Sequence, residues 1–339
     1  MSDILSLNNL KRPKLILNYI ILKVSYLLRL NHVPTLPTTL DIEPNNWCNF
    51  KCDHCQVTHW SKPKSELTIE NFTKIVQQFP SLSLVKVQGM GEPFLNKSTV
   101  DMLENLDSKG IQSTTISNGS VLTEKIIDRL SKLKNTSIAF SMDGATKNTF
   151  EGIRIKGNFD KVVANIKKLT KYCPNLDVSF WIVVTSKNYK ECEQTVDIAR
   201  ETGVNNITFQ TYLSNWGKDE MEQKINDVSM GKSKIHAYID LAVKVGQSKE
   251  VEVTRYDGDY MTKDKPCKWP WTSMYIDASG NVVPCCVLAD SDTMSFGNIF
   301  EENAKKIWNS KKYIGFRKQH ASGNIPDVCK ACYKMEKKG

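Results

Sequence analysis

The sequence predicts an α/β fold in which strand–helix units build a parallel sheet, followed by a small C-terminal α+β domain. Three observations support this. From residue 40 onward, short apolar runs alternate with amphipathic helical segments, which is typical of βα units. A chain of 339 residues suits one large domain plus a smaller one. Seven of the ten cysteines stand at metal-ligand spacings, in one early and one late group.

Six strand–helix units account for residues 40 to 210. The strands are predicted at Leu40–Glu43, Leu84–Gln88, Gln112–Ser117, Ser137–Met142, Asp177–Val184 and Ile207–Gln210. The helices are predicted at Ile69–Phe79, Lys97–Lys109, Glu124–Leu133, Phe159–Tyr172 and Tyr189–Thr202. Residues 211–232 show no clear period and are predicted as a loop, before a helix at Ile235–Val245 and a strand at Val251–Thr254. Six units are fewer than a full eight-stranded barrel needs.

The N-terminal segment, residues 1–38, is predicted to contain one helix over residues 11–30. Its polar positions form a narrow stripe, and the rest of its circumference is apolar: the stripe is Lys11, Lys14, Asn18, Ser25 and Arg29. No apolar run is long enough for a membrane span, and no small-residue cleavage site marks a signal peptide. Two interpretations stay open: a helix packed on the body of the protein, and an interfacial membrane anchor.

The early cysteine group is Cys48, Cys52 and Cys55, with three and then two residues between its members. Such spacing lets one loop direct several thiolates at one centre, and thiolates favour zinc or iron–sulfur clusters. Three ligands without a fourth in the same loop leave one iron of a cubane cluster open for a substrate or cofactor. A zinc knuckle is the alternative, although zinc sites usually close with four protein ligands.

Other special sequences follow the predicted strands, where parallel α/β folds carry their chemistry. Gly89-Met90-Gly91-Glu92 follows the second strand, and its glycines let the backbone approach a ligand. Asn118 follows the third strand, and Ser141-Met142-Asp143-Gly144 follows the fourth. Arg154 comes soon after; its guanidinium suits a carboxylate, with a surface arginine as the alternative.

Together these motifs resemble the radical S-adenosylmethionine (SAM) superfamily, whose loop reads C-x3-C-x-aromatic-C, with His54 at the aromatic position. The resemblance implies a partial (β/α)6 barrel over residues 39–247. It also implies a [4Fe–4S] cluster on Cys48, Cys52 and Cys55, a flavodoxin or ferredoxin as electron donor, and cleavage of SAM to a 5′-deoxyadenosyl radical. The residues it implies in SAM binding are His54, Gly89, Gly91, Glu92, Asn118, Ser141, Asp143 and Arg154.

The late cysteine group resembles the SPASM/twitch auxiliary domains over residues 248–339. Cys285 and Cys286 end a predicted hairpin, Cys267 precedes it, and Cys329 and Cys332 form a C-x2-C pair. No further cysteine follows Cys332, which favours the single-cluster twitch form. The ligands implied for an auxiliary [4Fe–4S] cluster are Cys267, Cys285, Cys329 and Cys332; zinc is the alternative. Three roles stay open for Cys286: a cluster ligand in place of Cys285, a buried residue that takes no part in the chemistry, or a hydrogen-atom donor to the substrate.

The amino-acid composition limits where the protein is expected to act and which kinds of molecule it is expected to bind. Reduced thiols place the protein in the cytoplasm, with membrane contact through residues 11–30 as an addition. A net charge of +9 suits an anionic substrate, whereas thin arginine and aromatic interleaving among the C-terminal lysines argues against nucleic acid.

The expected activity is that of a radical SAM oxidoreductase. It would abstract hydrogen from a small polar, carbohydrate-type substrate and give oxidation or epimerisation. Arg255 and Asp257 are candidates for the base that takes up the released proton. The alternatives are maturation of a ribosomally made peptide and a non-catalytic iron–sulfur or zinc protein.

Overall fold

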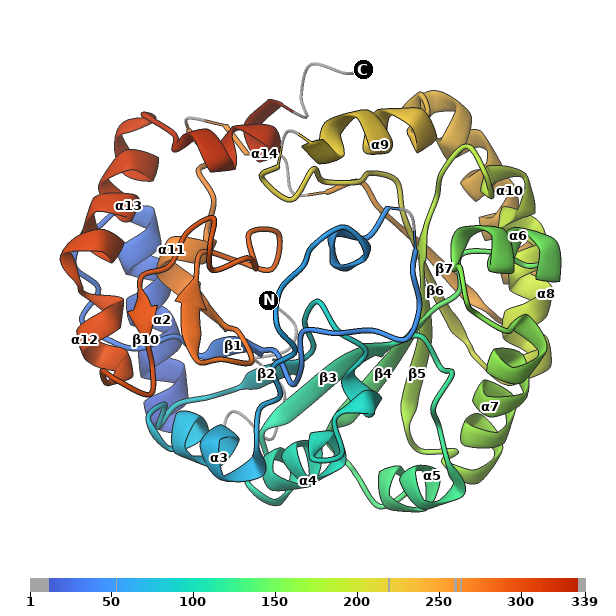
Figure 1. Cartoon of the computed structure of the whole chain (residues 1–339), viewed down its shortest axis with the longest axis horizontal. Coiled ribbons are helices and arrows are strands. Elements are labelled where there is room, and N and C mark those ends of the chain that lie inside the picture. The colour runs from blue at the N-terminus through green and yellow to red at the C-terminus, as the bar shows by residue number, and fades with distance from the viewer. Residues whose placement is uncertain (1–11, 53, 219, 259–260, 263, 335–339) are drawn as a thin grey trace.

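The computed structural model describes residues 12–52, 54–218, 220–258, 261–262 and 264–334. Its strands form one curved sheet with the order β10-β9-β8-β1-β2-β3-β4-β5-β6-β7 (Figure 1). From β8 through β7 all neighbours are parallel, whereas β9 and β10 are antiparallel additions. The strands are β1 Thr39–Ile42, β2 Leu84–Val87, β3 Gln112–Ser117, β4 Thr136–Ser141, β5 Asp177–Val183, β6 Asn206–Gln210, β7 Glu252–Tyr256, β8 Ser273–Ile276, β9 Asn281–Val283 and β10 Gly297–Asn298.

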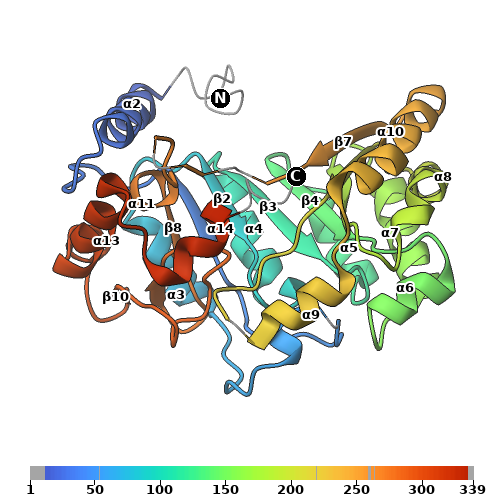
Figure 2. The same cartoon turned by 90° about the horizontal axis from the view of Figure 1, so that it is seen from above.

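The helices lie around the outside of the curved sheet, and the loop after β1 crosses its concave side (Figure 1). The helices of the barrel are α3 Ile69–Gln77, α4 Thr99–Ser108, α5 Glu124–Leu130, α6 Lys147–Ile153, α7 Phe159–Tyr172, α8 Cys192–Thr202, α9 Glu220–Val228 and α10 Lys232–Lys249. The remaining helices are α2 Pro13–Leu27, α11 Trp269–Thr272, α12 Ala304–Trp308, α13 Lys311–Ser322 and α14 Lys330–Lys334. Figure 2 shows α2 at one end of the molecule, beside α11 and α13.

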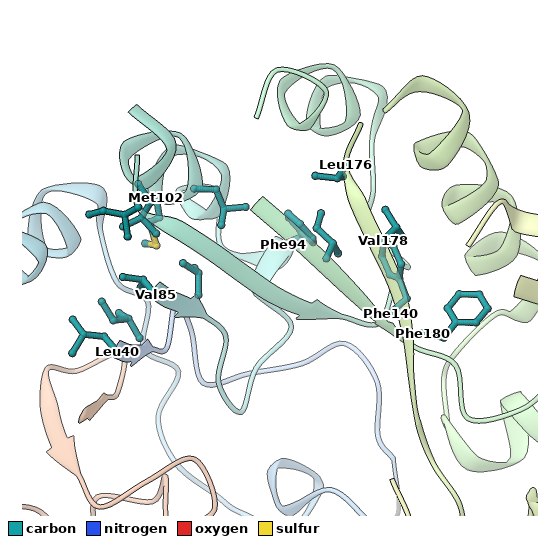
Figure 3. Packing of buried hydrophobic residues seen from close by; sticks show 14 of the residues in the cluster. Leu40, Val85, Phe94, Met102, Phe140, Leu176, Val178 and Phe180 are labelled. Carbon is teal, nitrogen blue, oxygen red and sulfur yellow. The ribbon is translucent and has the colours of Figure 1, made fainter. Parts of the chain in front are cut away.

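The main core lies between the convex face of the sheet and these helices. Strand residues alternate between the two faces of a sheet, so every second side chain points to the helices. Leu40 and Ile42 of β1 and Val85 and Val87 of β2 are fully buried in this layer. Figure 3 shows it continuing to Phe140 of β4 and to Val178 and Phe180 of β5. The intervening residues therefore face the concave side, which we call the lumen.

The open α/β barrel expected from the sequence is confirmed, and all six predicted strands are present within one or two residues of their expected ends. The prediction of a loop over residues 211–232 is wrong, because α9 begins there. Met221 and Ile225 are buried one helical turn apart, a pair too short to give a clear period. Helix α6 is a further element that was not predicted.

The C-terminal region does not form a separate sheet. Strand β7 pairs with β6, and β8 pairs in parallel with β1, so residues 248–339 extend the barrel sheet at both of its edges. The proposed boundary at residue 248 therefore does not coincide with a break in the sheet.

Candidate functional site

The loop that carries the early cysteines is held on both sides. Phe50 is buried in the main core, and the backbone N–H of Lys51 donates to the carbonyl of Ile155 at 2.9 Å. Burial raises the pKa of Cys48 to about 11 and that of Cys55 to about 12, and the neighbouring thiols add to both shifts. The three thiols are thus close enough to influence one another. Binding a cationic cluster would replace their protons.

No group of three or more His, Cys, Asp or Glu side chains among the described residues converges closely enough to hold a single metal ion. A cubane cluster does not require such convergence, because each cysteine binds a different iron.

The glycine turn after β2 is pressed against the end of β1. A Cβ at Gly89 would collide with the side chain of Glu43, and a Cβ at Gly91 would collide with Asn45. The backbone N–H of Met90 donates to Glu43 Oε2 at 2.8 Å, which fixes the turn. These glycines are therefore required for close packing of the turn beside the cysteine loop.

Glu92 connects the glycine turn to the next strand of the sheet. Its carboxylate accepts from the Ser117 hydroxyl and the Asn118 backbone N–H, both at 2.7 Å, and from the Phe94 N–H at 3.3 Å. It therefore joins the glycine turn to the end of β3. Both of its carboxylate oxygens therefore already accept hydrogen bonds from the protein.

Asn118 also supports the cysteine loop. Its amide donates to Asn49 Oδ1 at 3.0 Å and lies 3.7 Å from Cys48 Sγ. Asn49 in turn donates to the hydroxyl of Ser120 at 2.9 Å. The turn after β3 thus positions Cys48.

Asp143 and Arg154 form a buried ion pair behind this loop. Arg154 Nη2 donates to Asp143 Oδ2 at 2.6 Å, and the other carboxylate oxygen accepts from the Val183 N–H at 2.9 Å. His54 Nε2 lies 3.8 Å from Asp143 Oδ2. Asp143 is fully buried, so it positions Arg154 and His54 instead of offering a free carboxylate. Ser141 ends β4 half-buried on the lumen side.

The guanidinium of Arg154 carries the clearest sign of a missing ligand. Its Nε atom is buried and has no hydrogen-bond partner among the described residues. A buried donor without a partner costs about 1–3 kcal/mol. The charge of Arg154 acts on all three early cysteines. An anionic group bound beside these cysteines would satisfy this donor, and a carboxylate has the right geometry.

The late cysteines are gathered by the C-terminal elements. Cys329 ends a 3₁₀ turn, Asp327–Cys329, and Cys332 lies in α14. Burial raises the pKa of Cys285 well above its usual value, and the charges of Cys286, Cys267 and Cys332 raise it further. Cys267 and Cys332 act on Cys329 in the same way. The four predicted ligands therefore form one group, with Cys286 beside it.

The side chains that pack around the late cysteines are polar, yet most of them are buried. Tyr333 accepts from the Cys267 N–H at 2.9 Å and contacts His320 Nδ1 at the same distance. Burial lowers the pKa of His320 to about 4, so this ring is neutral at physiological pH. Arg317 stacks on Trp308 and Tyr313 and is fully buried.

The lumen beside the late cysteines holds charged residues that sequence reasoning missed. Asp41 of β1 pairs in register with Lys86 of β2 and Tyr275 of β8. Asp41 is fully buried, and neither carboxylate oxygen accepts a hydrogen bond among the described residues. Burial raises its pKa to about 6, and Lys86 opposes the shift. Charged residues inside apolar strands, Leu40-Asp41-Ile42 and Val85-Lys86-Val87, were the available signal.

A cluster of aromatic side chains, which we call the aromatic group, lies on and beside strands β5 and β7, toward the other end of the sheet from β8. Trp181 of β5 meets Tyr256 of β7 edge to face at 5.7 Å, and Tyr256 is also 5.7 Å from Tyr212. Burial raises the pKa of Tyr212, and the nearby thiols Cys286 and Cys332 contribute. The aromatic group therefore reaches from the lumen to the late cysteines.

Arg255 and Asp257 are placed away from the lumen. Arg255 binds Asp240 and Asp257 binds His236, and both of these partners belong to α10. Burial alone would raise the pKa of Asp257, but hydrogen bonds from Thr211, His236 and Arg255 outweigh it and lower the pKa. An ion-paired carboxylate on the helix side of the sheet is a poor proton acceptor for a substrate in the lumen.

Two family models match the chain. The radical SAM superfamily model matches residues 42–199, and the SPASM model, described as an iron–sulfur cluster-binding domain, matches residues 267–333.

The curated relatives have diverse activities. The tungsten-containing aldehyde ferredoxin oxidoreductase cofactor-modifying protein of Pyrococcus furiosus is 26% identical over 82% of each chain. The PqqA peptide cyclase of Xanthomonas euvesicatoria pv. vesicatoria is 21% identical over 88% of this chain and 81% of the relative. Among solved structures, Streptococcus suis SuiB bound to its precursor peptide SuiA has a TM-score of 0.71 at 16% identity. That match covers 86% of this chain and 69% of SuiB.

Proposed function

We propose, from the premise that this chain carries a radical SAM domain followed by a SPASM iron–sulfur domain, that it modifies a ribosomally made peptide by radical chemistry. The sequence predicts a carbohydrate-type substrate, because a net charge of +9 suits an anionic substrate. Relatives named for peptide substrates favour the peptide instead.

The cofactors that the two domains imply are a [4Fe–4S] cluster with SAM and auxiliary iron–sulfur chemistry. Cys48, Cys52 and Cys55 fit the first cluster, and the buried, unpaired Nε of Arg154 fits the carboxylate of SAM beside it. When bound, this pair supplies the 5′-deoxyadenosyl radical. The protein holds the reactants: Asp143 orients Arg154, while the glycine turn offers its backbone edge to the methionyl ammonium.

The observation that carries the substrate proposal is Asp41. A buried carboxylate without a hydrogen-bond donor is unfavourable, and Asp41 faces the lumen between Lys86 of β2 and Tyr275 of β8. A peptide presents backbone N–H groups to such a carboxylate and backbone carbonyls to Lys86. We therefore assign Asp41 and Lys86 to substrate binding. Cys267, Cys285, Cys329 and Cys332 would hold one auxiliary cluster.

The test does not require a known substrate. Cells of the organism that makes this protein are grown in deuterated medium. Their extract is separated into a peptide fraction and a low-molecular-mass fraction. Each fraction is incubated with the reduced enzyme and unlabelled SAM, and 5′-deoxyadenosine is analysed by mass spectrometry. We expect deuterium transfer from the peptide fraction, with loss of the transfer after protease treatment. Transfer from only the low-molecular-mass fraction would return the substrate to the carbohydrate class.

A further inference from the structure

Helix α2 displays large apolar side chains to solvent. Among the described residues, the exposed large hydrophobic side chains concentrate on this helix and its C-terminal extension: Leu17, Ile20, Val24, Leu27, Leu28 and Leu30. Leu17, Leu27 and Leu28 are each at least 60% exposed. At the helical repeat of 3.6 residues, positions 17, 20, 24, 27 and 28 lie on one face. An exposed apolar face of this kind marks an interaction surface.

The orientation of α2 is fixed by its opposite face. Leu15, Asn18, Leu22 and Ser25 are buried against the body, and the Asn18 amide donates to the Leu36 carbonyl at 3.0 Å. Two of the positions in the predicted polar stripe therefore face inward.

Aromatic contacts hold the C-terminal end of α2. Tyr26 packs edge to face on Trp271 of α11 at 5.7 Å, and Trp271 Nε1 donates to the Leu30 carbonyl at 2.8 Å. Rotating the helix to hide its apolar face would break these contacts.

The chain segment that carries this face contains charges of only one sign. Residues 11–40 contain five lysines and arginines and no aspartate or glutamate: the cations are Lys11, Arg12, Lys14, Lys23 and Arg29. Lys14 and Lys23 are exposed, and helical spacing places them on the two flanks of the apolar face. Long lysine side chains in this position can extend toward anionic groups while the apolar residues between them are buried.

We propose that α2 docks this protein on an anionic phospholipid surface, lying in the interface with Leu17, Ile20, Val24, Leu27 and Leu28 buried among the acyl chains. A single convex helix with aliphatic residues between basic flanks fits a bilayer interface. None of the helices in the described part of the chain is long and apolar enough to cross a bilayer, so the contact is peripheral. This proposal is independent of the substrate in the lumen.

The test is flotation of the full-length reconstituted enzyme with vesicles. Vesicles of phosphatidylcholine with phosphatidylglycerol are compared with vesicles of phosphatidylcholine alone. We expect flotation with the anionic vesicles, reduced by salt because exposed charges are screened. Lys14→Gln with Lys23→Gln should lower the partition coefficient on anionic vesicles by about thirtyfold, from the usual contribution of each basic residue near such a surface.

A second variant tests the apolar contribution. Leu17→Gln, Ile20→Gln, Val24→Gln and Leu28→Gln together should abolish flotation. The control is Leu241→Gln with Tyr172→Gln, which changes exposed apolar residues elsewhere and should float like the wild type. Circular dichroism and cleavage of SAM verify that each variant is folded and loaded. Absence of wild-type flotation, or equal flotation of all variants, overturns the proposal. Concentration-dependent dimerisation that the α2 variant loses, without flotation, would assign the face to a second copy instead.

Discussion

Replacing Asp41 with asparagine should make the protein more stable. Burial raises the pKa of Asp41 from 3.8 to about 6, so the folded state binds this proton more tightly than the unfolded state does. A folded-state pKa that is raised gives stability below the unfolded pKa, and this stability is lost as pH rises from about 4 to about 6. A shift of about two units corresponds to about 3 kcal/mol. Above pH 6 Asp41 must be buried as a charged carboxylate, and the folded wild type is destabilised by this full amount. We call this loss the charge penalty of Asp41.

Asparagine removes the charge but leaves a buried amide, which itself costs about 1–3 kcal/mol when unpaired. Subtracting this cost from the gain of about 3 kcal/mol, we expect a net gain in the free energy of unfolding of up to about 2 kcal/mol near pH 8. The charge penalty of Asp41 near pH 5 is about half as large, so the gain should shrink there.

The assay is anaerobic urea unfolding of the reconstituted protein at both pH values. Asp177→Asn is the control, because Asp177 is an exposed carboxylate at the start of β5. Its replacement should change the free energy of unfolding by no more than about 0.5 kcal/mol at either pH, since substitutions at exposed sites have small effects. The reasoning fails if Asp41→Asn is less stable near pH 8, or if its effect is independent of pH. If Asp41 binds substrate, the same variant should also lose deuterium transfer from the peptide fraction.

Three other changes test the candidate site. Gly91→Ala forces a Cβ against Asn45 and should reduce iron at the early cysteines, whereas Gly152→Ala, which has open space around it, should leave the iron content unchanged. Arg154→Lys keeps a cation beside Asp143 but removes the Nε donor, so equilibrium dialysis should show about tenfold weaker SAM binding; wild-type affinity would remove Arg154 from the SAM site. Cys329→Ser with Cys332→Ser should lower the iron content by one [4Fe–4S] equivalent and retain cleavage of SAM; unchanged iron would contradict the ligand assignment.

The central strands could be predicted from the sequence because they are apolar, short and separated by clear helices. Gln112–Ser117 was predicted with the ends that the structure shows. What the sequence could not show is which face of a strand a residue occupies. Arg255 and Asp257 precede Cys267 in the sequence, yet Arg255 points from β7 toward α10, and Asp257, one residue past the strand, binds the same helix.

The cysteine groups were predictable because their ligands are close in sequence, whereas the hydrogen bonds around them connect distant segments. Glu92 and Asp143 stand in motif positions, but only the fold shows that their carboxylates are occupied by neighbouring backbone groups. Asp41 belongs to no motif. Its significance depends on the missing donor, which no sequence pattern records.

The parallel pairing of β1 with β8 has a mechanical consequence. β1 leads into the loop of the early cysteines, and β8 begins the hairpin that ends at Cys285, so both groups are mounted on adjacent strands of one sheet. Neighbouring strands are held about 4.8 Å apart by their hydrogen bonds, which leaves no hinge between these two strands. Cutting away the C-terminal region would leave β1 with an unpaired edge and invite aggregation. If the auxiliary domain is exchanged between such enzymes, the new domain must therefore bring a strand that can pair with β1 as β8 does. A flexible linker between the two parts would not replace this pairing.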